Sequence, residues 1–468
     1  MSRTIKLVGL DCGSTTSCLV VASGCLTTGA LGRVDITDLE ESFRSELVFT
    51  PLTGTRIDTA RLEAHLDAWL NAAGVTPVEI FGGGVLITGL AAQRDNAAAV
   101  SAMLSKRLAD AVVAAADAPR LESWLAFMGN CHDLSQAHPE TPILNLDLGG
   151  GTTNLALGQR GQVLATGSLH VGARHFRFEP GSYRLLETSS LGAALLESLA
   201  IRRSIGEVLS PAEVAAIVDF YIAQLVAAIE GRSVTEDIAQ RHVQAPFALP
   251  AIDRGRLAIT LSGGVGQLVY RLKLSDVVFP PAEFGDLGGE LARGIANCST
   301  IADRLLWVPT GLGRATVLGL MRHSTELSGS TLYLPKPERL PLANVPIVGR
   351  VDQHTSAEQV TQLLRLAAAA EPAAALQVDL PQHDLIALRR VGELLATGLS
   401  EHLLPPQITL VLLVAENLGK ALGNYVTRWG TLKVELLVID EVPWRDAQFV
   451  RLGRLRETVV PLWLYAVR

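Results

Sequence analysis

Two stretches of the sequence share one design: Leu-Asp-Cys-Gly-Ser-Thr-Thr at residues 10–16 and Leu-Asp-Leu-Gly-Gly-Gly-Thr-Thr-Asn at residues 146–154. Each begins where an apolar run of strand length ends, and each is followed by a second run of that kind, so both predict a strand, a tight turn and a returning strand. A plain hairpin turn needs one glycine. Three in succession lose conformational entropy on folding and usually mark the close approach of a ligand or another backbone.

The residue types in these turns suit a phosphate ligand. Glycine lets the backbone N–H groups come close to an anion, and hydroxyl groups can bind the same oxygens. The first turn offers Gly13, Ser14, Thr15 and Thr16. A carboxylate at the strand end, as at Asp11, can hold Mg²⁺ through water. The other interpretation of the first stretch is ordinary turn chemistry, which also favours Asp, Gly and Ser.

A third stretch, Ser-Gly-Gly-Val-Gly at residues 262–266, follows an apolar run at 257–261. Small residues here leave room for a flat group such as adenine against the backbone. The sequence contains no Gly-x-x-x-x-Gly-Lys-[Ser/Thr], which excludes a P-loop, and it has no Rossmann fingerprint.

Composition limits the class of protein. The chain has 468 residues, of which 48% are hydrophobic and 19% charged, which favours two or three α/β domains with buried parallel strands. The formal net charge is −7 and no basic block occurs, so we expect no nucleic-acid partner. The five cysteines form no Cys-x-x-Cys pair, and we expect them to be small buried side chains rather than metal ligands. No apolar run approaches the ~20 residues of a membrane helix, so a soluble, cytoplasmic protein without a membrane partner is expected.

Periodicity and turn signals predict further elements. Helices are expected at 61–73, 96–116, 211–230, 363–370, 383–397 and 418–426, the first ending at Gly74 and the fifth at Gly398. Strands are expected at 5–10, 17–22, 79–88, 143–148, 154–157, 257–261, 376–380, 408–414 and 434–439. The repeated strand–turn–strand pattern suggests domains at 1–140 and 141–335, and the later alternation of strands and helices suggests a C-terminal α/β region at 336–468.

The order of the three motifs resembles that of the phosphate-1, phosphate-2 and adenosine motifs of the actin-like ATPase superfamily. The resemblance implies an actin/Hsp70-like fold, with duplicated ribonuclease H-like domains and a nucleotide cleft between them, and it implies ATP and Mg²⁺ as cofactors. By this resemblance Asp11 and Asp147 hold Mg²⁺-bound water. The phosphates are held by Gly13, Ser14, Thr15, Thr16, Gly149, Gly150, Gly151, Thr152 and Thr153, and Gly263 and Gly264 border the adenosine. The superfamily often has Asp where this chain has Asn154, which cannot act as a carboxylate base, and no other catalytic residue can be named.

Further segments resemble one family, the ethanolamine ammonia-lyase reactivating factors known as ethanolamine utilization protein EutA. They lie at 85–97, 262–266, 285–288, 314–319, 323–331, 340–346, 418–423 and 439–442. The resemblance implies a chaperone-like, ATP-dependent factor whose partner is ethanolamine ammonia-lyase. Such a factor promotes release of damaged cobalamin and its exchange for intact adenosylcobalamin, in the cytoplasm and in association with a bacterial microcompartment. The chain departs from the family pattern at 127–132, 415–417 and 446–448, which bears on the partner rather than on the nucleotide.

Other functions remain open at this point. An actin-like filament or cell-division ATPase would polymerise with nucleotide, and a sugar-kinase-type enzyme would need a carboxylate base facing a substrate hydroxyl, for which the sequence offers no candidate. An activator carrying an Fe–S cluster is disfavoured by the lack of paired cysteines. The sequence leaves the oligomeric state open, a homo-oligomer included, and does not say whether ATP is hydrolysed or only bound.

Overall fold

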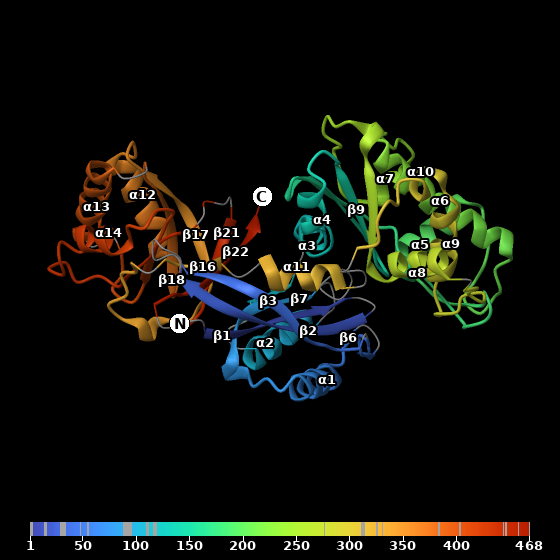
Figure 1. Cartoon of the computed structure of the whole chain (residues 1–468), viewed down its shortest axis with the longest axis horizontal. Helices are drawn as coiled ribbons and strands as arrows, with labels where there is room; N and C mark the ends of the chain where they lie inside the picture. Colours follow the sequence, from blue (N-terminus) through green and yellow to red (C-terminus); the bar gives the residue numbers. More distant parts are fainter. Residues whose placement is uncertain are drawn as a thin grey trace.

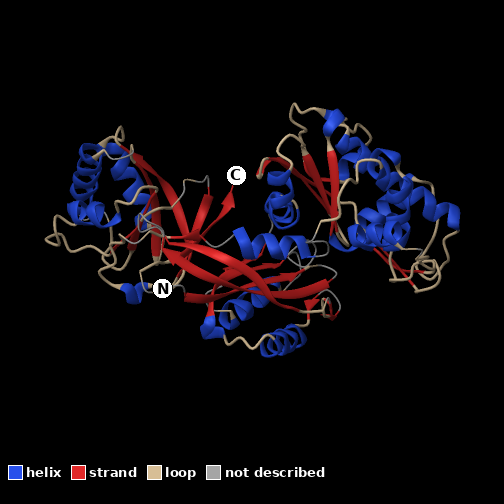
Figure 2. Ribbon diagram, viewed as in Figure 1, coloured by secondary structure: helices blue, strands red, loops and turns tan. Residues whose placement is uncertain are grey.

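Three β-sheets organise the chain (Figures 1 and 2). The computed structural model describes residues 3–13, 16–28, 34–46, 48–53, 56–87, 96–108, 112–115, 119–275, 277–309, 314–323, 326–329, 331–381, 384–401, 404–442, 444, 447–456 and 458–467. In Figure 1 the first sheet lies at the bottom centre, the second at the upper right and the third at the left.

The first sheet has strand order β3-β2-β1-β7-β8. Its strands are β1 (Arg3–Cys12), β2 (Thr16–Thr28), β3 (Val34–Arg44), β7 (Ile80–Ile87) and β8 (Val112–Ala115), with short β4 (Val48–Phe49) beside β2 and a separate β5 (Leu52–Thr53) and β6 (Arg56–Ile57) hairpin. The first three strands are antiparallel, and β1, β7 and β8 are parallel. Alternating residues separate the two faces: Leu10 and Leu19 pack with α1 (Thr59–Ala72) and α2 (Ala97–Arg107), whereas Leu7 and Val20 pack with α11 (Ala315–His323).

The second sheet repeats this plan. Its strands are β9 (Ile143–Leu148), β10 (Thr153–Gln159), β11 (Gln162–Leu169), β14 (Val243–Ala245) and β15 (Ala258–Ser262), in the order β14-β11-β10-β9-β15. Strand β9 takes the place of β1, antiparallel to β10 and parallel to β15. Asp11 pairs with Cys18 across the first hairpin and Asp147 pairs with Asn154 across the second. The shared order and directions confirm the predicted duplication of an actin-like, ribonuclease H-like domain.

Helices and small elements complete this second unit. They are α3 (Pro119–Asn130), α4 (His132–Ala137), α5 (Ser190–Ser198), α6 (Pro211–Ile229), α7 (Asp237–Arg241), α8 (Gly263–Leu274), α9 (Gly288–Asn297) and α10 (Ser299–Ala302), with strands β12 (Phe176–Phe178) and β13 (Leu185–Thr188). Short 3₁₀ turns occur at Pro77–Glu79, Ala173–His175, Arg254–Arg256 and Pro337–Arg339.

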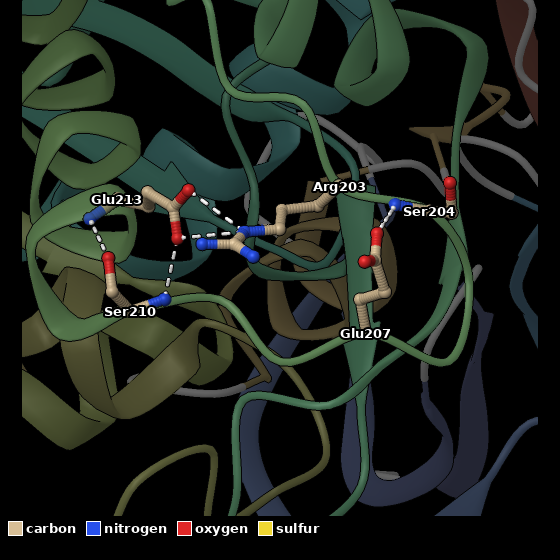
Figure 3. A network of polar contacts seen from close by, with 5 residues as sticks. All are labelled: Arg203, Ser204, Glu207, Ser210 and Glu213. Carbon is tan, nitrogen blue, oxygen red and sulfur yellow. Dashed lines mark hydrogen bonds and ion pairs between the residues drawn. The ribbon is translucent and has the colours of Figure 1, made fainter.

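Helix α6 shows how local sequence fixes an element. Ser210 caps it, accepting from the Glu213 N–H, while the Glu213 carboxylate accepts from the Ser210 N–H at 2.6 Å (Figure 3). Arg203 donates to both oxygens of Glu213, and Ser204 N–H donates to Glu207. This capping box satisfies backbone donors that a helix start leaves without partners. Within the described part of the chain, α6 is the one helix long and apolar enough to cross a membrane by length and composition, and its inner side lies in the core of the second unit.

The third sheet has strand order β16-β22-β21-β17-β18-β19-β20. Its strands are β16 (Glu326–Leu327), β17 (Leu342–Asp352), β18 (Ala373–Asp379), β19 (Thr409–Val414), β20 (Leu436–Ile439), β21 (Ala447–Leu452) and β22 (Pro461–Val467). Strands β17 to β20 are parallel. They alternate with α12 (Ala357–Ala368), α13 (Leu385–Ser400) and α14 (Gly419–Val426), whose apolar sides share a core with one face of the sheet. This confirms the predicted alternation.

Helices α3 and α11 cross at two glycines, one on each helix. A Cβ at Gly129 would lie 1.9 Å from Ala315 O, and one at Gly319 would lie 2.0 Å from Leu125 O. The backbones therefore touch where only glycine fits. Helix α3 packs on the second sheet and α11 on the first, so this crossing joins the first two units.

Two expectations were wrong. The single helix expected at 96–116 ends at Arg107, and Val112–Ala115 instead forms β8, where two β-branched residues gain a parallel pairing with β7. Gly398 does not end α13, which continues to Ser400. The glycine instead leaves room for α12, because a Cβ at this position would lie 2.8 Å from Leu364 Cδ1. The stop at Gly74 is confirmed, with φ of 63° two residues after α1. The division into three domains stays a prediction. Helix α11 falls within the second predicted domain, 141–335, but packs on the first sheet.

Candidate functional site

The first turn of α11 contacts both of the repeated hairpins. The Thr316 side chain lies close enough to the Asp147 carboxyl group, at the end of β9, to lower its pKa. Two residues earlier, Arg314 Nη2 donates to Ser45 O at 2.7 Å, and Ser45 Oγ accepts from Leu19 N–H of β2 at 2.8 Å. One short segment thus connects the second unit's Asp strand to the first unit's hairpin.

Asp147 is held in an oriented position. Ser262 Oγ, at the end of β15, donates to Asp147 Oδ1 at 2.6 Å and accepts from Asn145 Nδ2 at 3.0 Å. Burial raises the pKa of Asp147, and the hydrogen bonds from Ser262 and Thr316 act in the opposite direction. A carboxylate that loses water but keeps fixed donors is suited to accept a positive charge.

Asp11 lies near the end of β1 in the first unit, and α11 packs on this strand. Burial, and next the charge of Asp11, raise the pKa of Cys18 to about 12, while the charge of Arg314 lowers it. Asp11 pairs with Cys18 across the β1–β2 hairpin, and the charge of Arg314 acts on the same thiol. The segment 314–316 thus acts on one group in each hairpin, Cys18 in the first and Asp147 in the second, although the two are far apart in sequence.

The rest of the first motif is only partly described. Gly13 follows β1 and its carbonyl accepts from Thr50 Oγ1 at 2.6 Å. Thr16 begins β2 and pairs with Phe49 of β4. Ser14 and Thr15 lie outside the described residues.

A five-residue segment, 171–175, here called the strap, braces the glycine turn of the second motif. Three successive carbonyl oxygens of the turn accept from the strap: Gly149 O from Ala173 N–H at 3.2 Å, Gly150 O from Arg174 N–H at 2.6 Å, and Gly151 O from His175 Nε2 at 2.8 Å. Within the turn, Gly149 N–H donates to Thr152 O at 2.9 Å. The three-glycine sequence is thus a close approach between two backbone segments.

His175 has one consistent tautomer. Its Nε2 faces a carbonyl and so carries the hydrogen, which leaves Nδ1 to accept from Ser189 Oγ at 2.8 Å. Burial lowers the pKa of His175 to about 4, so the ring is neutral at physiological pH. Ser189 also caps α5, accepting from Gly192 N–H at 2.9 Å. His175 therefore ties the glycine turn to a helix end.

The remaining predicted residues have different environments. Thr152 is half-buried, whereas Thr153 is fully buried and its hydroxyl donates to Val171 O of the strap at 2.7 Å. Gly263 has φ of 75° and a Cβ there would lie 2.3 Å from Leu148 O, so it must be glycine. A Cβ at Gly264 would meet nothing within 4 Å, so this position borders open space.

Polar side chains continue from Asp147 into the second unit. Asn145 Oδ1 accepts from Thr260 Oγ1 at 3.0 Å and from Asn130 Nδ2 at 2.8 Å. Asn154 donates to Glu122 Oε2 at 2.9 Å, so it is fixed against α3. Sequence reasoning assigned no role to Thr316, Arg314 or the strap. The polar network around Asn145 did have a signal in the sequence. Polar residues occupy alternate positions of two otherwise apolar strands, Asn and Asp in Ile143–Leu148 and Thr and Ser in Ala258–Ser262.

Cysteine and metal chemistry add little to this site. In the described part of the chain, no group of three or more His, Cys, Asp or Glu residues gathers as a metal-binding cluster. The five cysteines are free thiols; Cys12, Cys18 and Cys131 are buried as predicted, and Cys25 and Cys298 are partly buried.

Comparisons with known proteins agree in both sequence and length. The family model of ethanolamine utilisation protein EutA matches residues 3–466. Ethanolamine ammonia-lyase reactivase EutA of Salmonella typhimurium is 30% identical over 97% of this chain and 95% of its own. The protein of that name from Escherichia coli has the same identity and coverage. Among solved structures, an Aquifex aeolicus Ppx/GppA family member is 15% identical, covers 60% of this chain and 73% of its own, and has a TM-score of 0.34.

Proposed function

The chain belongs to the EutA family of ethanolamine utilisation proteins, and on that premise we propose that it is an ATP-dependent reactivating factor for adenosylcobalamin-dependent ethanolamine ammonia-lyase. Two relatives that match it over nearly their whole length carry the name ethanolamine ammonia-lyase reactivase. In this role it acts on the lyase as a chaperone-like partner, promoting release of damaged cobalamin and its exchange for intact cofactor.

The observation that carries the nucleotide part is that α11 packs on β1, the strand of Asp11, and places Thr316 beside Asp147 at the end of β9. The residues around it fit Mg-ATP, because a carboxylate, hydroxyl groups and glycine backbone stand together at each turn and Gly264 borders open space. We assign Mg²⁺-bound water to Asp11 and Asp147, and the adenosine to Gly263 and Gly264. The phosphates are assigned to Gly13, Ser14, Thr15, Thr16, Gly149, Gly150, Gly151 and Thr152. Thr153 supports the turn, because its hydroxyl donates to Val171 O of the strap.

Bound Mg-ATP supplies a concentrated charge that can hold two units together, and its hydrolysis or release removes that restraint. The residues of this chain orient it: Ser262 and Thr316 position Asp147, and the strap fixes the glycine turn. Thr316 lies on α11, so a movement at this site can pass to α3 through the crossing of the two helices. We propose that the resulting movement reaches the lyase, in the cytoplasm and in association with a microcompartment.

Calorimetry with Mg-ATP tests the site. Asp147→Asn keeps the hydrogen-bonding shape but removes the charge, and we expect it to weaken Mg-ATP binding at least tenfold, as should Asp11→Asn. Asp219→Asn, on α6 in the second unit, is the control and should bind like the parent. Equal affinity in all three variants would contradict the assigned site.

A reactivation assay tests the partner. Cyanocobalamin-blocked ethanolamine ammonia-lyase is mixed with the protein, ATP, Mg²⁺ and adenosylcobalamin, and recovery of deamination is measured. We expect recovery with the parent and its loss with Asp147→Asn. If the parent binds Mg-ATP but restores no activity where a known reactivase does, the nucleotide site stands and the proposed partner is wrong.

A further inference from the structure

Three segments of the third unit, none of them assigned to nucleotide, meet at the carboxyl end of β20. They contain Gly329 after β16, Gly419 at the start of α14, and Asp440 after β20. Gly329 N–H donates to Asp440 O at 2.9 Å, and Gly419 N–H lies 3.4 Å from Asp440 Oδ2. A Cβ at Gly329 would lie 2.7 Å from Asp440 Oδ1, and one at Gly419 would lie 3.1 Å from Asp440 Cβ. Two glycines thus make room for one carboxylate.

Asp440 is an incompletely satisfied buried acid. Its side chain has 0% exposed surface, and burial raises its pKa. Among the described residues nothing donates to its Oδ1 atom. A buried carboxylate oxygen without a donor loses its hydration without compensation, which destabilises the folded chain. Such an orphaned atom requires an explanation, and it faces Gly329, which also adjoins the Glu441 side chain.

The oxygen atoms around Asp440 outnumber the hydrogens available to them. The Thr331 hydroxyl contacts two acceptors, Asp440 Oδ2 and Asn417 Oδ1, the latter at 2.6 Å, but it has one hydrogen to donate. Asn417 Nδ2 donates to Glu441 Oε1 at 2.6 Å. If the Asn417 amide is turned so that Nδ2 faces Thr331, the Thr331 hydroxyl is satisfied. Asn417 Oδ1 then faces Glu441 Oε1, which places two acceptor oxygens together. Either arrangement needs one more proton or a cation among these oxygens.

We propose that these four residues form a binding site for a hard divalent cation of the Mg²⁺ or Ca²⁺ class. The ligands are the carboxylates of Asp440 and Glu441, the Thr331 hydroxyl and the Asn417 amide oxygen. All are oxygen donors, which these cations prefer, and water can supply the other ligands. A proton on Asp440 Oδ2 would satisfy Thr331 but leave Oδ1 without a partner, whereas a cation between the carboxylates satisfies both. The ion would join Gly329 and Thr331 to the segments at 417–419 and 440–441.

Calorimetric titration of the chelator-treated, nucleotide-free full chain with CaCl₂, and separately with MgCl₂, tests the site. The measurements use an Asp147→Asn background, so that the proposed nucleotide site binds no Mg²⁺. A wrong assignment of the nucleotide site is then not mistaken for a wrong assignment of the cation site. We expect one saturable cation, and at least tenfold weaker binding in Asp440→Asn and Glu441→Gln. The control is Asp379→Asn, a half-exposed carboxylate at the same sheet edge that pairs with Arg350, which should bind like its parent.

Thermal unfolding gives a second readout. We expect the cation to raise the melting temperature of the parent and of Asp379→Asn but not of Asp440→Asn; if Asp440→Asn fails to fold, Glu441→Gln answers the question. No cation binding by the parent at millimolar concentration overturns the proposal. So does equal binding by parent and variants. If Asp440→Asn is instead more stable than its parent at neutral pH and no cation binds, Asp440 takes a proton and the site is not a cation site.

Discussion

Replacing Gly129 by alanine tests the contact between the first two units. The new Cβ would lie 1.9 Å from Ala315 O and 2.4 Å from Gly319 N. These are backbone atoms inside a helix and cannot rotate away. To reach the 3.4 Å at which ordinary contacts begin, α3 and α11 must separate by about 1.5 Å, or the chain must deform by an equivalent amount.

The magnitude follows from two opposing effects. Overpacking costs about 1–3 kcal/mol, and a forced backbone clash lies at the upper end. Alanine recovers about 1 kcal/mol of helix propensity over glycine. We therefore expect the free energy of unfolding to fall by about 2 kcal/mol. Mg-ATP binding should weaken as well, because Thr316 sits on the displaced helix and holds Asp147.

The assay is urea unfolding followed by circular dichroism, together with Mg-ATP calorimetry. The control is Gly398→Ala, also inside a helix, where the new Cβ meets only side-chain atoms of Leu364 and Val360, at 2.8 and 3.3 Å, that can shift; we expect a change within about 1 kcal/mol. If Gly129→Ala unfolds at the same urea concentration as the parent and binds Mg-ATP equally well, the two helices do not touch as described.

Three further predictions concern buried polar groups. The pKa of His175 falls from 6.5 to about 4 on folding, so between these pH values the unfolded chain binds a proton that the folded chain does not. The free energy of unfolding should therefore decrease as pH falls through this window, by up to about 3 kcal/mol. His175→Gln should remove this part of the pH dependence, as urea titrations at pH 7 and pH 4.5 will show. Burial raises the pKa of Cys131 to about 12, so a thiol reagent at pH 8 should modify the partly buried Cys298 first and Cys131 only on unfolding, as peptide mapping by mass spectrometry will reveal. Asn96 bonds both backbone groups of Ile57, at 2.9 and 2.7 Å, and Asn96→Ala should lower the free energy of unfolding by about 2 kcal/mol, whereas an unchanged urea midpoint would mean that these two bonds contribute nothing net.

Local pattern was sufficient to predict the parts of the fold where sequence and structure share a period. The strand at Ile143–Leu148 was predicted with its observed bounds, because an apolar run there meets a glycine turn at once. The duplication was also readable, since both hairpins repeat one motif. Pattern failed at Val112–Ala115, where an alanine-rich helical stretch continues into residues that pair with β7. Only the tertiary partner distinguishes those two states.

The site was predictable in its backbone and not in its supporting side chains. Glycines and aspartates were found because their chemistry repeats. The strap and Thr316 were not, because they contact the motif across 18 or more residues of sequence and their residue types are common. Strand β17 shows the same limit, since it pairs antiparallel with β21 in its first half and parallel with β18 in its second.

Helix α11 connects the nucleotide motifs to the third unit. Its first turn holds Asp147 through Thr316, its apolar side packs on the first sheet, and β16 begins three residues after its last residue, His323. Strand β16 pairs with β22 of the third sheet and leads to Gly329 and the cation site proposed above. A movement of α11 that changes the Asp147 contact must therefore also be accommodated at 326–331. By thermodynamic linkage, if Mg-ATP alters the affinity of the Asp440 site for its cation, that cation must alter the affinity for Mg-ATP by the same factor.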